Sequence, residues 1–63
     1  MTFGEKVKKV RTEQLYSQRE FAKILGVSYV MLNQWETEKA KPNYKWQRLF
    51  KEYCEKNNYS FDV

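Results

Sequence analysis

The sequence predicts an all-α domain with a compact arrangement of four helices, allowing a short last element as a fifth. Apolar residues recur every three or four positions along most of the chain, as they do on one face of a helix. Residues suited to helix N-caps precede these stretches, and a glycine and a proline interrupt them. No alternation of apolar and polar residues is long enough to predict a β-sheet.

The first helix is expected to begin after Thr2 as its N-cap and to end near residues 14–15. Ser17 is followed three residues later by Glu20, the pattern of a capping box, and this pair predicts a second helix over residues 18–25. The apolar faces of these two helices contain Phe3, Val7 and Val10 in the first, and Phe21, Ala22 and Leu25 in the second.

Gly26 follows the second helix at once, where a left-handed residue commonly ends a helix. Ser28 is expected to cap a third helix that ends near residues 36–37, and Pro42 prevents its continuation. Asn43 is the predicted cap of a last helix, which fades at residues 57–58. The apolar stripe of that helix consists of Trp46, Leu49, Phe50, Tyr53 and Cys54.

The length of 63 residues allows one domain, which we place at residues 1–56, followed by a C-terminal tail at residues 57–63. A chain of this size buries only about 60% of the surface that its unfolded form exposes. Four phenylalanines, five tyrosines and two tryptophans compensate, because each rigid ring buries a large area. We therefore expect most of the aromatic residues to lie in the core, although the surplus on the last helix could also form a surface for a partner subunit.

The composition limits the classes of partner and activity that we expect for this chain. Twelve Lys and Arg against eight Asp and Glu give a net charge of +4, which favours an anionic partner without choosing between nucleic acid, membrane and acidic protein. The chain has no histidine, and its single cysteine, Cys54, cannot form an internal disulfide. We expect no enzymatic activity, metal, cofactor or small-molecule substrate, and a reducing, cytoplasmic location. No apolar run approaches the roughly 20 residues of a membrane span, so no membrane role is expected.

Two short helices on either side of a turn that contains glycine, as at Gly26, are the pattern of a helix-turn-helix unit, in which the second helix enters the major groove of DNA. The same geometry is common in helical proteins generally, so the residues themselves carry the argument. The residues SQREFAKILGVS at 17–28 resemble the Cro/repressor-type (XRE-like) helix-turn-helix family. The resemblance covers residues 3–54 and includes Leu32, Trp35-Glu36 and Lys41-Pro42. It implies a sequence-specific transcriptional regulator of bacterial or phage type that binds double-stranded DNA. More specifically, it implies a nucleoid-associated repressor that binds a palindromic operator as a homodimer through the helix at about residues 28–36.

Arg11 and Glu36 lie beside the apolar faces of the first and third helices, four residues after Val7 and Leu32 respectively. The resemblance implies that these two residues form a partly buried ion pair, which would fix the tilt of the third helix. The alternative is a pair of independent surface charges.

The outer face of the third helix is uncharged. On a helical wheel centred on Leu32, with about 100° per residue, Val30, Asn33, Gln34 and Thr37 lie on the opposite side. Asn and Gln amides can bond adenine, and Val and Thr methyl groups can pack on the thymine methyl. The resemblance assigns base contacts to these four residues and to Tyr29, which could instead pack on a sugar-phosphate or on the domain. The alternative for this face is plain solvent-exposed surface.

Phosphate contacts are expected on both sides of this face. Gln18 opens the second helix, where free N–H groups and the helix dipole favour an anion, and the resemblance implies that this glutamine clamps a phosphate. Arg19 is its neighbour. A second group follows the third helix: Lys39, Lys41, Asn43 and Lys45. The alternative is a solvated charged loop. The lysines of the first helix, Lys6, Lys8 and Lys9, are expected to be solvated or to contribute a diffuse positive field.

Three departures from the family pattern stand out. Glu38 occupies a position where the family usually has glycine, and Leu15 one where glycine or asparagine often ends the first helix. Members commonly carry a fifth helix that forms the dimer, for which only residues 57–63 remain. The alternative function is a protein-interaction module, such as an antitoxin or anti-repressor, and the charge of Glu38 is its best support.

Overall fold

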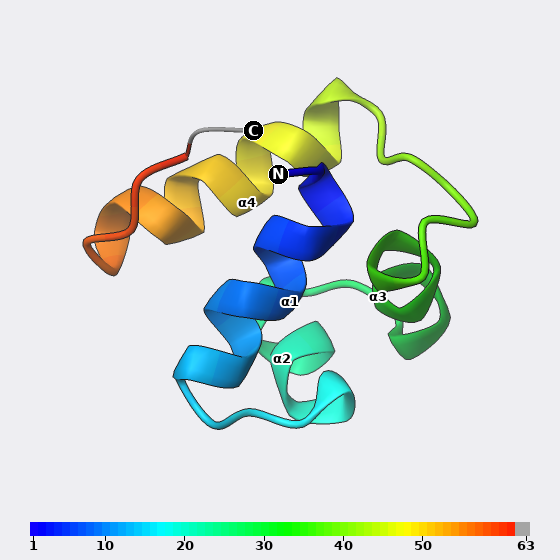
Figure 1. Ribbon diagram of the computed structural model, residues 1–63, viewed down its shortest axis with the longest axis horizontal. Helices are drawn as coiled ribbons and strands as arrows, with labels where there is room; N and C mark the ends of the chain where they lie inside the picture. Colours follow the sequence, from blue (N-terminus) through cyan, green and yellow to red (C-terminus); the bar gives the residue numbers. More distant parts are fainter. Residues whose placement is uncertain (62–63) are drawn as a thin grey trace.

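The computed structural model describes residues 1–61 and contains four α-helices in the order expected (Figure 1). They are α1 (Phe3–Glu13), α2 (Gln18–Leu25), α3 (Tyr29–Glu36) and α4 (Tyr44–Lys56). Within residues 1–61 there is no strand and no fifth helix. The all-α prediction is confirmed, and the last two residues of the expected tail, 62 and 63, lie outside the described residues.

Each helix begins where its sequence signal predicts. A side-chain oxygen of the cap residue accepts a hydrogen bond from the backbone N–H three residues later, in Thr2, Ser17, Ser28 and Asn43. In α2 the Glu20 carboxylate also accepts from the Ser17 N–H at 2.9 Å, which completes a capping box. This backbone hydrogen bond, assisted by the Ser17 hydroxyl, holds the pKa of Glu20 below its usual range. The capping box therefore fixes the start of α2.

Each of the four helices is followed within two residues by a residue with left-handed backbone, but only one of these residues is glycine. The φ angles are 63° at Leu15, 77° at Gly26, 61° at Glu38 and 62° at Asn58. After α3 the Glu38 N–H donates to the Trp35 carbonyl at 3.2 Å, and the Lys39 N–H donates to the Gln34 carbonyl at 2.9 Å. This is the Schellman pattern, which satisfies the last carbonyls of a helix. The departures at Leu15 and Glu38 thus keep the backbone turn that glycine would adopt with less strain.

The core lies between the helices, with α3 packed on α1 and α2, and α4 packed on α2. Its buried residues are Val7, Val10, Phe21, Ala22, Leu25, Leu32, Trp35, Phe50 and Cys54. On α4, Phe50 is fully buried, and the Tyr53 ring meets the Phe21 ring edge-on at 5.2 Å between centroids. The Tyr53 hydroxyl also donates to the Gln14 side chain at 2.8 Å. The aromatic residues Phe50 and Tyr53 thus serve the core.

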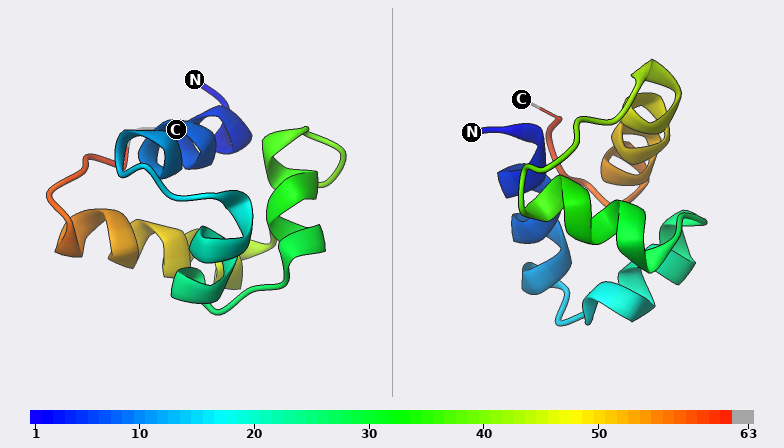
Figure 2. Two further views of the ribbon diagram at one scale, coloured as in Figure 1. Left: turned by 90° about the horizontal axis from the view of Figure 1, so that it is seen from below. Right: turned by 90° about the vertical axis from the view of Figure 1, so that its right-hand side faces the viewer.

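Residues 57–61 fold back from the end of α4 (Figures 1 and 2). The Tyr59 N–H donates to the Cys54 carbonyl at 2.8 Å, which starts this reversal. The Phe61 ring lies 6.1 Å from the Phe50 ring and 6.4 Å from the Phe3 ring, centroid to centroid. This part of the tail therefore extends the aromatic core.

The prediction of a solvated position is wrong for Lys6, which is only 6% exposed, whereas Lys8 and Lys9 are exposed. Lys6 lies three residues after Phe3 and four before Val10, so the helix places it on the buried face. A lysine can occupy such a position because its long aliphatic stem packs against apolar groups.

Gly4 brings α1 into close contact with the end of α3. A Cβ atom built on Gly4 would collide with the Trp35 carbonyl oxygen and would also lie 3.0 Å from the Trp35 carbonyl carbon. This contact could not be predicted from the sequence, because nothing local requires a glycine in the first turn of α1. The contact helps to fix where the C-terminal end of α3 lies.

Candidate nucleic-acid interface

Helix α3 lies along one face of the molecule, with α1 and α2 on its inner side (Figure 2, right). Leu32 is fully buried and Trp35 is 3% exposed, so they anchor the helix to the core. On the opposite side, Val30 is 61% exposed and Gln34 and Thr37 are also exposed. The surface expected to face DNA is therefore not covered by the described part of the chain.

The polar side chains on this face differ in how many hydrogen bonds they already make within the domain. The Gln34 side chain makes no hydrogen bond within residues 1–61, so its amide can both donate and accept. The Thr37 hydroxyl donates to the Asn33 carbonyl at 2.8 Å, which commits its hydrogen and leaves its oxygen as an acceptor. Asn33 is half-buried and turned toward α2. Of these side chains, Gln34 is the one with its full bonding capacity available.

Tyr29, at the start of α3, is 39% exposed and packs against Arg19 of α2. The Arg19 guanidinium carbon lies 4.5 Å from the centroid of the Tyr29 ring, a cation–π contact. One face of the Tyr29 ring is thus covered by the domain itself. Packing on the domain was one of the alternatives that the sequence analysis gave for this residue. The contact also holds the positive charge of Arg19 beside the N-terminal end of α3.

Arg11 and Glu36 form a bidentate ion pair between α1 and α3. Arg11 Nε donates to Glu36 Oε2 at 2.7 Å and Arg11 Nη2 donates to Glu36 Oε1 at 2.9 Å. Arg11 Nη1 donates to the Tyr16 carbonyl at 2.9 Å. The side chains are 12% and 3% exposed respectively, so both charges are largely removed from water. The pair fixes the last turn of α3 relative to α1 and to the α1–α2 turn.

Two further hydrogen bonds extend this ion pair to α2 and back to α3. Gln18 Nε2 donates to Glu36 Oε1 at 3.0 Å, and Asn33 Nδ2 donates to Gln18 Oε1 at 3.3 Å. We call Arg11, Glu36, Gln18 and Asn33 the amide network. The sequence did not predict its Gln18 links, because helical spacing on one helix says nothing about how two helices cross. The network joins a residue expected to hold phosphate to a residue expected to read a base.

The N-terminal end of α2 offers backbone donors to an anion. The first N–H groups of a helix lack intrahelical acceptors. The Ser17 hydroxyl accepts from the Glu20 N–H at 3.1 Å, which leaves the N–H groups of Gln18 and Arg19 without an acceptor in the described chain. The positive end of the helix dipole adds to their attraction for negative charge.

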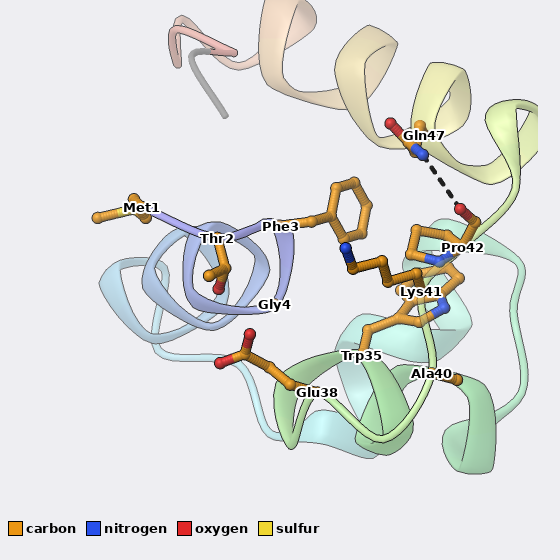
Figure 3. Close-up of a pocket in the computed structure, with 10 residues that line it drawn as sticks. All are labelled: Met1, Thr2, Phe3, Gly4, Trp35, Glu38, Ala40, Lys41, Pro42 and Gln47. Atoms are coloured by element: carbon orange, nitrogen blue, oxygen red, sulfur yellow. Dashed lines mark hydrogen bonds between the residues drawn. The ribbon is translucent and has the colours of Figure 1, made fainter.

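The basic residues of the loop that follows α3 are all exposed. Lys41 reaches toward the Phe3 ring across a pocket of about 410 Å³ (Figure 3). Lys45 Nζ lies 5.0 Å from the centroid of the Trp46 ring, and Asn43 Oδ1 is occupied as the cap of α4. Lys39 follows the left-handed residue Glu38, whose carboxylate adds a negative charge to the same loop. The loop is basic overall, with one acidic interruption.

Within residues 1–61 no helix combines the length and the apolar character needed to cross a lipid bilayer. The same residues contain no group of three or more His, Cys, Asp or Glu side chains that could hold a metal ion.

A family model described as helix-turn-helix matches residues 7–45, which run from the middle of α1 to the first turn of α4. This range includes both partners of the ion pair, the turn at Gly26 and the whole of α3. Neither the curated proteins nor the solved structures that were searched gave a match to the chain.

Proposed function

Since the chain belongs to the XRE-type helix-turn-helix family of DNA-binding regulators, we propose that it is a sequence-specific repressor. In this proposal it binds a palindromic operator as a homodimer and inserts α3 into the major groove. The observation that carries the proposal is the exposed outer face of α3, where Val30, Gln34 and Thr37 present apolar and amide groups without an acidic side chain. Such groups match the donors, acceptors and methyl groups on base edges.

We assign base contacts to Tyr29, Val30, Asn33, Gln34 and Thr37. Gln34 is the main reader, because its amide is fully available and an amide can bond adenine N6 and N7 together. Val30 packs on a thymine methyl group. The half-buried Asn33 and the Arg19-covered Tyr29 contact the duplex from the side of α2.

We assign phosphate contacts to two regions that flank α3. The first is the start of α2, where the free N–H groups of Gln18 and Arg19 and the Arg19 guanidinium favour an anion. The second is the loop into α4, with these residues: Lys39, Lys41, Asn43 and Lys45. In a dimer that neutralises about six phosphates, log K falls with log salt concentration with a slope near −5.

Selection of bound sequences from random duplex DNA, at near-physiological salt, tests the proposal directly. We expect enrichment of an inverted repeat whose half-sites lie about one helical turn apart, because the symmetry of a dimer is copied in its operator. Sedimentation of the complex with the selected duplex should give two chains per site. Binding without enrichment would contradict sequence-specific recognition. No binding to DNA would favour a protein-interaction module such as an antitoxin, for which the exposed Glu38 would be the first contact to test.

Replacing Gln34 by alanine tests the assignment of the main reader. We expect Gln34→Ala to cost about 1–3 kcal/mol of binding free energy on the selected site and to relax preference at one base pair. Binding to random duplex should change little, since the amide does not contact phosphate. Titrations on both duplexes measure this difference, with Ser60→Ala, at an exposed position of the tail, as the matched control. Equal losses on selected and random DNA would refute a base-reading role for Gln34.

A further inference from the structure

The buried carboxylate of Glu36 determines which way the Gln18 amide points. An ionised carboxylate accepts hydrogen bonds and cannot donate them. Both oxygens of Glu36 are already held by Arg11, at 2.7 and 2.9 Å, so the carboxylate cannot rotate away. Gln18 must therefore present Nε2 to Glu36 Oε1, at 3.0 Å, because the flipped amide would place two oxygens against each other.

The same constraint passes to Asn33 on α3. With Nε2 of Gln18 fixed toward Glu36, its Oε1 faces Asn33 and can only accept. Asn33 therefore donates from Nδ2 to Gln18 Oε1, at 3.3 Å. Its Oδ1 then points away from Gln18, and one hydrogen of Nδ2 remains free. Each of these two amides, which could otherwise adopt two orientations, is thus held in a single one.

We propose that this polarity relay from Glu36 through Gln18 makes Asn33 specific for adenine. The inference rests on the proposed function, because it requires α3 to lie in the major groove. Adenine offers the N6 amino group as donor and N7 as acceptor, which match Oδ1 and the free N–H of Asn33. Guanine offers two acceptors, O6 and N7, and its O6 would face Oδ1. Gln18 is a positioning residue in this scheme, in addition to its place at the phosphate.

Two substitutions of Gln18 interrupt the relay in different ways. Gln18→Met keeps a side chain of similar length but removes both the donor and the acceptor. Gln18→Lys keeps a donor for Glu36 and adds positive charge near the phosphate, but it provides no acceptor for Asn33. In both variants the Asn33 amide becomes free to flip and to present Nδ2 to guanine. The lysine variant keeps a hydrogen-bond donor for the Glu36 carboxylate. It therefore still tests the proposal if the methionine variant does not fold.

The experiment is selection of bound sequences for the wild type, Gln18→Met, Gln18→Lys, Asn33→Ala and Gln34→Ala. Asn33→Ala identifies the base pair that Asn33 reads. At that base pair we expect the wild type to prefer adenine over guanine by about 10-fold, in the range of one bidentate contact. We expect both Gln18 variants to reduce this preference to about 2-fold, while the position lost in Gln34→Ala keeps its preference.

The outcomes separate the relay from the proposed function. If both Gln18 variants change affinity for all sequences alike and keep the adenine preference, Gln18 is a phosphate contact only and the relay is wrong. If Asn33→Ala alters no base preference while Gln34→Ala does, the relay is also wrong, although α3 still reads DNA. If no variant alters any preference and the wild type enriches no sequence, the proposed function itself fails.

Discussion

The turn before α3 and the turn after it share a backbone conformation but not a residue type. Gly26 has φ 77° and Glu38 has φ 61°, and each lies beside the C-terminal end of a helix. Open space surrounds the position where Gly26 would carry a Cβ atom, so only its backbone angle requires glycine. Glu38 instead adopts the left-handed angle at a cost of about 1–2 kcal/mol for a residue with a Cβ atom.

The difference indicates that the two ends of α3 are held in different ways. The N-terminal end is positioned by local signals, namely the glycine turn and the Ser28 cap. The C-terminal end is positioned by contacts between helices, which are strong enough to maintain a strained turn. Those contacts are the Arg11–Glu36 ion pair and the close approach of Gly4 to Trp35. Variants at the two ends should therefore differ in size of effect and in what rescues them.

The largest effect is expected from breaking the ion pair. Glu36→Gln leaves the Arg11 charge in a largely buried position without its partner, which should cost about 3–5 kcal/mol of unfolding free energy. Urea denaturation followed by circular dichroism measures the loss. Glu52→Gln, at an exposed position on α4, is the matched control and should change stability little. A loss no larger in Glu36→Gln than in this control would mean that the pair does not hold α3.

The next largest effect is expected from filling the contact between α1 and α3. Gly4→Ala places a methyl group against the Trp35 backbone, which cannot move like the end of a flexible side chain. We expect a loss of about 1–3 kcal/mol, as for other overpacked sites. Thermal unfolding measures it.

Asparagine substitutions at the two glycines sharpen the same comparison. Gly26→Asn should be tolerated better than Gly26→Ala, because asparagine adopts left-handed angles more readily. Gly4→Asn should be as damaging as Gly4→Ala or worse, since the obstacle there is space. Equal tolerance at both positions would contradict the distinction between a local and a tertiary requirement.

The elements of the fold could be predicted from the sequence because their signals are local. The cap residues Thr2, Ser17, Ser28 and Asn43 each begin a helix, and Gly26 makes the turn. The exposed face of α3 could also be predicted, since the buried position of Leu32 places Gln34 on the outside of the same helix.

The features that were missed all depend on how helices cross. Gly4 needs no special backbone angle, and only the path of α3 above it excludes a side chain. Lys6 has a charged end that suggests solvent, yet its stem lies on the packed side of α1. The hydrogen bonds of Gln18 to Glu36 and from Asn33 join two helices, and their geometry exists only once the helices are packed. Spacing along one helix cannot supply such distances.

The smallest effect, a gain in stability, is expected from relieving the strained turns. Glu38→Gly and Leu15→Gly should each stabilise the fold by about 0.5–1 kcal/mol, because the relief of left-handed strain slightly exceeds the greater chain entropy that glycine loses on folding. Leu15 is 90% exposed, so its removal sacrifices little packing. A gain of 1 kcal/mol corresponds to roughly 4–8 °C in Tm for a domain of this size.

The charge of Glu38 can be separated from its backbone angle with Glu38→Gln, which keeps the strain and removes the charge. Both Glu38 variants should bind DNA more tightly at low salt, because they lose a negative charge beside the loop to which we assign phosphate contacts, whereas Leu15→Gly should leave binding unchanged. Thermal unfolding and salt-dependent titrations of the three variants measure the two effects independently. If Glu38→Gly is no more stable than Glu38→Gln, the left-handed strain at residue 38 does not exceed the chain entropy that glycine loses on folding, and the turn then gives no support for contacts between helices holding the C-terminal end of α3 against strain.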